Sequence, residues 1–266
     1  KEKGFYDEVG LNVEIKQRDL KYNNIDEVIN GNAQYGVADS ILILYRLKQQ
    51  PVVIVSPIFQ HSPSVFISLK KNNISSIYEL NNKDILFYPN NTDGFSLLAM
   101  VKKFDLDVNL VRERYKDDYM RLINNEVDVM PAYIANEPFL FKEKGYDVNI
   151  INPTNYGFDM YGDMLFTNED EAKNNPIRVE KFKEATLKGW KYALENKEEI
   201  IQLINEKYSK EKSIEHLRYE ANAIDSLINK DVTPLGYLDQ GRIRYISEMY
   251  EYYGLTESKK DLNDFL

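Results

Sequence analysis

The stretch Ala33-Gln34-Tyr35-Gly36-Val37-Ala38-Asp39-Ser40 decides the fold class, because a short apolar segment here leads directly into a helix. Residues 33–38 are predicted as a strand, and Asp39 or Ser40 is predicted to cap a helix that runs to about Lys48. The same alternation of strand and helix continues along the chain to about residue 167. Strands that alternate with helices of about ten residues are typical of an open α/β sheet.

The predicted elements change character in the last third of the chain. Strands are expected at 12–16, 33–38, 51–59, 65–69, 84–88, 108–111, 127–133, 148–151, near Phe158 and at 164–167. Helices are expected at 24–30, 39–48, 77–80, 95–104, 117–124 and 136–144. After Asn175 only helices are predicted, at 176–195, 197–208, 213–228 and 241–253. Their apolar residues fall three and four positions apart, which predicts a helical layer that covers a sheet.

Composition excludes several classes of function. The 266 residues carry 34 basic and 43 acidic side chains, a net charge of −9, which argues against a nucleic-acid partner. The absence of cysteine excludes thiol catalysis, disulfides, thiolate zinc sites and iron–sulfur clusters. The scattered glycines form no phosphate-binding loop, so no cofactor is expected. No stretch approaches the roughly 18 apolar residues that a transmembrane helix needs.

The two histidines, His61 and His216, lack the spacing of zinc ligands, and no catalytic residue or metal site is predicted. His216 lies on a strongly charged segment and is expected to be solvated. His61 lies in the polar turn Gln60-His61-Ser62-Pro63 between two predicted strands. This position allows either a contact with a ligand or a structural hydrogen bond.

Three carboxylates stand out by position. Asp39 and Glu137 each lie between a predicted strand and a helix, and Asp163 ends the aromatic-rich segment 156–163. The alternative role of Asp39 is an ordinary N-cap, and that of Glu137 is to stabilise the N-terminus of its helix. Ligands of open α/β sheets bind where strands end and helices begin. The pattern therefore favours recognition of a small polar or aromatic molecule over catalysis.

The sequence resembles the NMT1/THI5-like (SsuA/THI5-like) family of periplasmic solute-binding proteins. The motifs that carry the resemblance are 3–15, 31–40, Gln60-His61-Ser62-Pro63, Tyr133-Ile134-Ala135-Asn136-Glu137-Pro138-Phe139 and 156–167. The segments at 60–63 and 136–139 look like the versions fused, as sensor domains, to bacterial histidine kinases and diguanylate cyclases. Many other relatives are free lipoproteins that serve ABC importers.

The resemblance implies the type II periplasmic-binding-protein fold. We expect two α/β lobes joined by a two-strand hinge, with the C-terminal helices packed on lobe one. Lobe one is expected to comprise residues 1–71 and 160–266, and lobe two residues 72–159. A first strand, which normally supplies part of the ligand site, and most of a first helix are expected to precede Lys1.

The resemblance also implies an extracytoplasmic binding domain at the periplasmic or extracellular face of a bacterial inner membrane. Its partners would be a small-molecule ligand and a membrane-embedded signalling or transport protein, with the sensor and importer roles both open. The alternatives are a purely structural interaction domain and an enzyme of the pyrimidine-synthase type. Eukaryotic members of that type consume their own histidine and pyridoxal phosphate. Their cysteine-rich motif cannot exist here, so that activity is not carried over.

The predicted ligand site combines carboxylates, tyrosines, one histidine and small polar side chains, without a basic cluster. Such a set suits a neutral or cationic nitrogen heterocycle, such as a thiamine-pyrimidine-like compound, better than a sulfonate or phosphate. The predicted ligand-binding residues are Asp39, Ser40, Gln60, His61, Asn91, Thr92, Tyr133, Asn136, Glu137, Tyr156, Tyr161 and Asp163.

Overall fold

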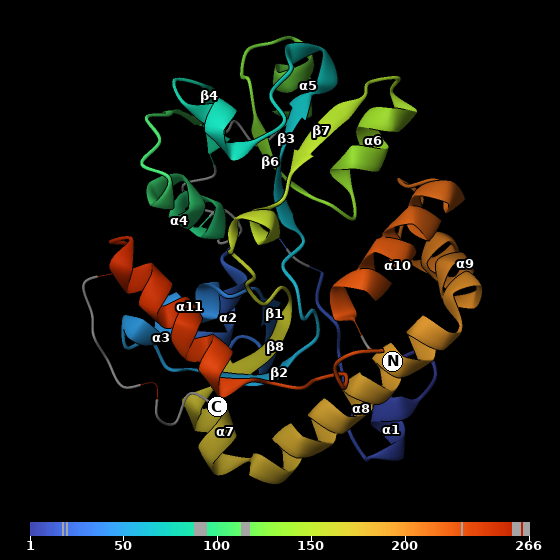
Figure 1. Cartoon of the computed structure of the whole chain (residues 1–266). Coiled ribbons are helices and arrows are strands. Elements are labelled where there is room, and N and C mark those ends of the chain that lie inside the picture. The colour runs from blue at the N-terminus through green and yellow to red at the C-terminus, as the bar shows by residue number, and fades with distance from the viewer. Residues whose placement is uncertain are drawn as a thin grey trace.

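The protein has a mixed α/β fold built on separate sheets (Figure 1). The computed structural model describes residues 1–17, 19, 21–87, 95–112, 118–229, 231–256 and 262. The first sheet has the order β1-β8-β2, with β8 antiparallel to both neighbours. Its strands are β1 (Tyr35–Ala38), β2 (Val52–Pro57) and β8 (Met164–Asn168).

The second sheet has the order β6-β3-β7 and lies above the first sheet in Figure 1. A parallel pair, β4 with β5, joins it through a bridge between Ile85 and Val129. These strands are β3 (Ser64–Leu69), β4 (Asp84–Phe87), β5 (Asn109–Arg112), β6 (Met130–Tyr133) and β7 (Val148–Ile151). The chain passes between the two sheets at residues 58–63, the first crossing, and returns at 157–163, the second crossing.

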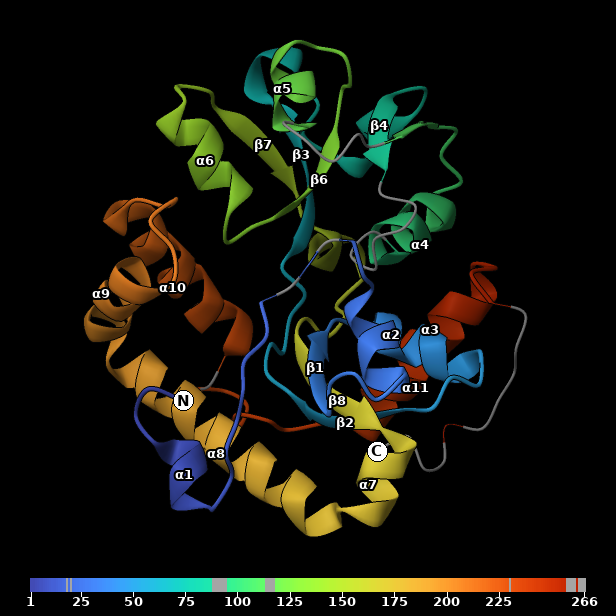
Figure 2. The ribbon, with the colours of Figure 1, turned by 180° about the vertical axis from the view of Figure 1, so that it is seen from behind.

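Helices surround both sheets (Figures 1 and 2). Around the first sheet lie α1 (Phe5–Glu8), α2 (Asn24–Ile29), α3 (Ile41–Leu47), α7 (Glu169–Asn174), α8 (Pro176–Glu195) and α11 (Gln240–Tyr252). Around the second lie η1 (Lys70–Asn72), η2 (Ile77–Leu80), α4 (Phe95–Lys103), α5 (Asp118–Ile123), α6 (Glu137–Glu143) and η4 (Pro153–Tyr156). The pair α9 (Lys197–Lys207) and α10 (Ile214–Ile228) stands beside both sheets.

Strand β3 shows why a mainly apolar segment forms a central strand here. Val65 and Ile67 pack into one core with Phe141 of α6, whereas Phe66 packs into another with Phe166 of β8. All six residues of β3 are buried, because β6 and β7 flank its two edges and helices cover both of its faces. A strand that is buried on both faces carries apolar residues on both, so its sequence does not alternate between apolar and polar residues.

The expected strand at 12–16 and the expected strand near Phe158 are both wrong. Residues 11–17 contain no strand, and within the described residues no strand pairs with them. A β-strand requires inter-strand hydrogen bonds, so the alternation of Val13 and Ile15 alone does not form one. Phe158 lies in the second crossing, where the backbone bonds to the first crossing instead of extending a sheet.

The C-terminal helices differ from the simple layer that their periodicity predicted. Helix α8 does pack on β2 of the first sheet, but α9 packs mainly on α10, and α10 reaches α6 beside the second sheet. His216 of α10, expected to be solvated, is only 3% exposed because it is enclosed between α10 and α6. Its charged neighbours in the sequence occupy the other faces of the helix.

A buried carboxylate ties the first sheet to the helices that follow it. Glu171, 7% exposed, accepts hydrogen bonds from the Tyr35 hydroxyl (2.8 Å) and the Asn175 amide (3.0 Å). Arg178 of α8 donates through both Nε (2.6 Å) and Nη2. The hydrogen bond from Arg178 is the main cause that holds the pKa of Glu171 below its usual range.

We predict that Glu171→Gln lowers the free energy of unfolding at neutral pH. The variant should also lose less of that free energy than wild type as the pH falls. A carboxyl group with a lowered folded-state pKa stabilises the protein above its ordinary pKa, and this contribution is lost as pH falls through the lowered value. The expected cost at pH 7 is about 1–2 kcal/mol, kept modest because solvent screens the half-exposed Arg178. Urea unfolding from pH 7 to pH 3 measures it.

Glu180→Gln is the matched control, because Glu180 pairs with Lys183 at 3.6 Å on the solvated surface of α8. Its effect should stay below about 0.5 kcal/mol. Parallel stability curves for wild type and Glu171→Gln below pH 5 would contradict the role given to Glu171.

Candidate functional site

The two crossings are bonded to each other where they pass between the sheets. The N–H groups of Ile58 and Phe59 donate to the carbonyl oxygen of Asp163 (2.8 and 3.1 Å), and the Gly162 N–H donates to the Phe59 carbonyl oxygen (3.1 Å). A Cβ atom at Gly162 would lie 2.8 Å from both the His61 carbonyl oxygen and the Phe59 Cβ. Glycine at 162 therefore permits the close approach that brings the predicted residues of both crossings together.

His61 is held by the second crossing through its side chain. Its Nδ1 lies 2.7 Å from Asp159 Oδ1, and its Nε2 lies 3.5 Å from the amide of Asn229. Asp159 Oδ1 also lies 2.9 Å from Nη2 of Arg242, whose guanidinium stacks over the ring of Tyr161 at 4.3 Å. Of the two roles that the sequence allowed for His61, the structure shows the structural hydrogen bond.

The junction of β1 and α3 also contacts the second crossing. Asp39 Oδ1 accepts the N–H of Ile41 at 2.9 Å, as a helix cap does. Ser40 is 1% exposed, and its hydroxyl lies 3.2 Å from the Tyr250 hydroxyl and 3.6 Å from the sulfur of Met160. Burial raises the pKa of Tyr250, which stays a neutral partner for Ser40. Ser40 is therefore used in packing, and Asp39, 5% exposed, is buried beside it as the cap of α3.

The turn after β6 is organised by Glu137. Its Oε2 accepts the N–H of Tyr133 (2.6 Å), and its Oε1 accepts the side-chain amide of Asn136 (2.9 Å). The N–H of Ile134 donates to the carbonyl oxygen of Pro63 (2.8 Å), which attaches this turn to the first crossing. A carboxylate offers about four lone-pair sites, so about two remain for a further donor.

Tyr156 and Tyr161, which the sequence predicted to bind the ligand, have contacts within the protein. Tyr161 has no exposed surface, and its hydroxyl accepts the N–H of Asp239 (2.9 Å). Tyr156 accepts the N–H of Ile77 (3.1 Å) and packs edge-on against Phe104 at 5.7 Å. Both rings are used in packing, because the segment that carries them fills the space between the sheets.

Of the remaining predicted residues, Gln60 is buried and donates to the carbonyl oxygen of Tyr237 (2.9 Å), a contact within the protein. Asp163 is half-buried and accepts the hydrogen bonds of the first crossing through its backbone. Asn91 and Thr92 lie outside the described residues. The structure thus gathers six predicted residues around the crossings: the buried Asp39 and the partly exposed His61, Tyr133, Asn136, Glu137 and Asp163.

Sequence reasoning missed three residues of this region. Asp159 and Arg242 are 83 positions apart, and no local pattern connects them. Ser64, the first residue of β3, directly follows the polar turn of His61 and lies opposite Tyr133 in the sheet. Its hydroxyl is buried without a hydrogen-bond partner, a condition that within the described part of the chain it shares only with Nε2 of His216.

The region around His61 contains several carboxylates, and the guanidinium of Arg242 is already matched there. Arg242 donates to the carboxylate and the carbonyl oxygen of Asp159, so its charge is neutralised within the protein. No group of three or more potential metal-binding side chains occurs in the part of the chain that the structure describes. Across those same residues, no helix has the length and apolar character needed to cross a membrane.

Comparison with known proteins identifies the family. Residues 1–200 match the family model described as NMT1/THI5 like, so the chain belongs to this family. It is 24% identical over 208 residues to a formylaminopyrimidine-binding protein of Halalkalibacterium halodurans, covering 76% of this chain and 63% of that protein. It is 25% identical over 213 residues to the riboflavin-binding protein RibY of Chloroflexus aurantiacus, covering 76% and 59%. The chain thus spans about three fifths of these curated relatives.

Solved structures agree on the fold. The periplasmic sulfonate-binding protein SsuA of Methylobacillus flagellatus, described as part of a putative sulfonate ABC transporter, is similar with a TM-score of 0.66. The identity is 20%, and the match covers 91% of this chain and 74% of that one. A Candida albicans protein with the generic periplasmic binding protein fold matches with a TM-score of 0.70 at 12% identity, covering 99% and 89%. The chain therefore has the periplasmic-binding-protein fold.

Proposed function

We propose that this protein binds a small molecule between two lobes that close on it. Lobe one would comprise residues 1–71 and 160–266, and lobe two residues 72–159, with the paired crossings as the hinge. The observation that carries the proposal is the position of Asp39, His61, Tyr133 and Glu137, each next to one of two crossings that join separate sheets. Small ligands bind preferentially at boundaries of this kind.

The proposed ligand is a nitrogen heterocycle. The crossings carry carboxylate acceptors, while the guanidinium of Arg242 is already matched by Asp159. Acceptors of this kind suit the exocyclic amines and ring N–H groups of a heterocycle, whereas a sulfonate needs unmatched donors. Two curated relatives are named for binding formylaminopyrimidine and riboflavin, which are both nitrogen heterocycles.

The proposed setting is the outer face of a bacterial inner membrane, with a membrane-embedded partner. The solved neighbour SsuA is a periplasmic protein of a putative sulfonate ABC transporter, which supports a receptor that delivers its ligand to an importer. The sensor domain of a histidine kinase or diguanylate cyclase is the second form of the same proposal, supported by the motifs at 60–63 and 136–139. Both forms use one closing motion of the same ligand site.

Calorimetric titration tests the function and the ligand class together. Formylaminopyrimidine and riboflavin are titrated beside an alkylsulfonate of similar size, and we expect one heterocycle to bind reversibly. Tight binding of the alkylsulfonate instead would overturn the ligand class.

Absorption spectra with added pyridoxal phosphate address the pyrimidine-synthase alternative, since a lysine Schiff base would add a new band. We expect no band.

Glu137→Gln should weaken binding of the heterocycle by about tenfold or more, because a charge-assisted hydrogen bond contributes about 1.5–3 kcal/mol. Calorimetry measures the change in Kd. Glu79→Gln is the matched control, since the Glu79 carboxylate also accepts backbone N–H groups, those of Ser75 (2.6 Å) and Ser76 (2.9 Å), remote from the crossings. Equal Kd values for Glu137→Gln and wild type would remove Glu137 from the site.

Ser64→Ala should weaken binding while leaving the free protein as stable as wild type or more stable. A buried hydroxyl without a partner costs about 1–3 kcal/mol, and a ligand that bonds to it recovers this cost. We expect affinity to fall about fivefold or more. Calorimetry and urea unfolding measure the two effects.

Ser68→Ala on the same strand is the control for Ser64→Ala, because the Ser68 hydroxyl already donates to the carbonyl oxygen of Ile74. It should lower stability and leave affinity unchanged. If Ser64→Ala changes stability alone, the Ser64 hydroxyl does not contact the ligand.

A further inference from the structure

Helix α10 contacts α6 along one face, and both views of the ribbon show them side by side (Figures 1 and 2). The Ser213 hydroxyl donates to Glu143 Oε1 (2.7 Å), and His216 Nδ1 lies 3.5 Å from Glu143 Oε2. The ring of Phe139 lies 5.0 Å from that of His216 and 5.1 Å from that of Tyr219. We call these contacts the α6–α10 interface.

The centre of the interface is buried. His216 is 3% exposed, packs against the ring of Phe139, and has no hydrogen-bond partner for its Nε2. The Tyr219 hydroxyl donates to the carbonyl oxygen of Ile134 (2.8 Å), and burial raises the pKa of Tyr219. Ile134 belongs to the turn that Glu137 organises, so α10 contacts the segment that carries the proposed ligand-binding carboxylate.

The other end of α10 is fixed to the part of the molecule around the first sheet. Leu227 and Ile228 pack with Ile58 and Phe59 of the first crossing and with Trp190 of α8. Arg218 makes a two-point contact with Glu198 of α9 (2.7 and 2.8 Å), and Lys197 pairs with Asp225 at 2.7 Å. Any movement that separates the second sheet from this helical layer must therefore break the α6–α10 interface.

We propose that α10 is a positioning element for α6. Ser213, His216 and Tyr219 hold the second sheet close to the helical layer, and this raises ligand affinity without touching the ligand. The inference rests on the proposed function, binding between two lobes. Apparent affinity scales with the fraction of molecules in the competent arrangement, so loosening the α6–α10 interface lowers both that fraction and the affinity.

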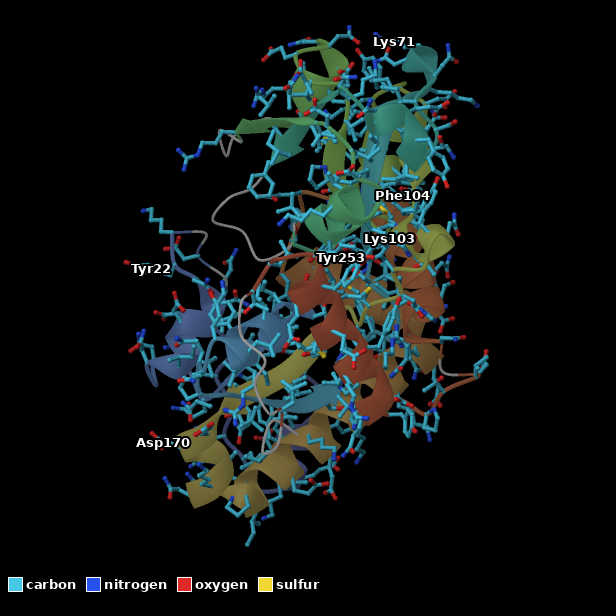
Figure 3. All side chains as sticks on the ribbon, turned by 60° about the vertical axis from the view of Figure 1, so that its left-hand side comes forward. Tyr22, Lys71, Lys103, Phe104, Asp170 and Tyr253 are labelled. Carbon is cyan, nitrogen blue, oxygen red and sulfur yellow. The ribbon has the colours of Figure 1, made fainter. Side chains whose placement is uncertain are left out.

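The separation of the two parts can be measured without a ligand. Lys71 and Asp170 are exposed and lie at opposite ends of the molecule (Figure 3). The sequence has no cysteine, so Lys71→Cys and Asp170→Cys place two spin labels on the full chain without other reactive thiols. Double electron–electron resonance then reports the distribution of distances between the labels.

Ser213→Asp is the variant that tests the α6–α10 interface. Ser213 caps α10 by accepting the N–H of His216 (3.0 Å), and aspartate is an equally good cap, so the helix should still form. The new carboxylate faces Glu143, and the like charges repel. We expect longer and broader label distances, and a formylaminopyrimidine Kd raised about fivefold or more if that compound is the ligand.

Two further variants make the interpretation specific. Adding Glu143→Lys to Ser213→Asp places opposite charges together and should restore the short distances. Tyr219→Phe should lengthen them to a smaller degree, because it removes only the hydrogen bond to Ile134. Tyr192→Phe is the matched control, since the Tyr192 hydroxyl bonds to Glu199 (2.6 Å) within the helical layer, and it should leave the distances unchanged.

Unchanged distances in Ser213→Asp would overturn the proposal. A shift in the label distances that Glu143→Lys fails to reverse would also overturn it, because the cause would then be local loss of α10. A shift of equal size in Tyr192→Phe would overturn it as well. The distances need no ligand. Failure of formylaminopyrimidine and riboflavin to bind therefore counts against the proposed function, whereas the distance distributions decide on α10.

Discussion

The hydrogen bonds between the two crossings are the constraint on which the rest of the structure depends. The carbonyl oxygen of Asp163 accepts two N–H groups of the first crossing, and Gly162 lies so close to His61 that a side chain there would collide. This contact sets the distance between the first and second sheets at the point where the chain passes between them. The β1–α3 junction and the turn after β6 are attached to the same two segments.

The charges around the crossings are balanced locally, and this balance shapes what the region can bind. Asp159 is shared by His61 and Arg242, so one carboxylate holds a histidine and neutralises a guanidinium. Glu137 is partly used by its own turn, and Asp39 by its own helix. What remains is the Glu137 carboxylate, which keeps about two lone-pair sites, beside a guanidinium that is already matched. This balance is the basis of the proposed preference for a donor-rich ligand.

The helical layer has a second role beside covering the first sheet. Helix α8 packs along β2, and the α9–α10 pair extends this layer to the second sheet, where Tyr219 contacts the turn of Glu137. The two sheets are therefore connected in two ways, by covalent crossings and by a non-covalent helical contact. In the proposed closing motion, the crossings would limit the path and the helical contact would bias the endpoint.

The sequence by itself determined the local elements and the family. Apolar periodicity placed most strands and helices within a few residues, and local patterns located Asp39 and Glu137 at helix starts, because such features depend on neighbours in the chain. Tertiary structure alone decided which polar groups meet. Ser40 and Met160 are 120 positions apart, and Asp159 and Arg242 are 83 apart. The missing strand at 12–16 and the burial of His216 have the same origin, since a strand needs a partner strand and burial needs an opposing surface. Neither feature can be predicted from local sequence, because each depends on residues that are distant in the chain.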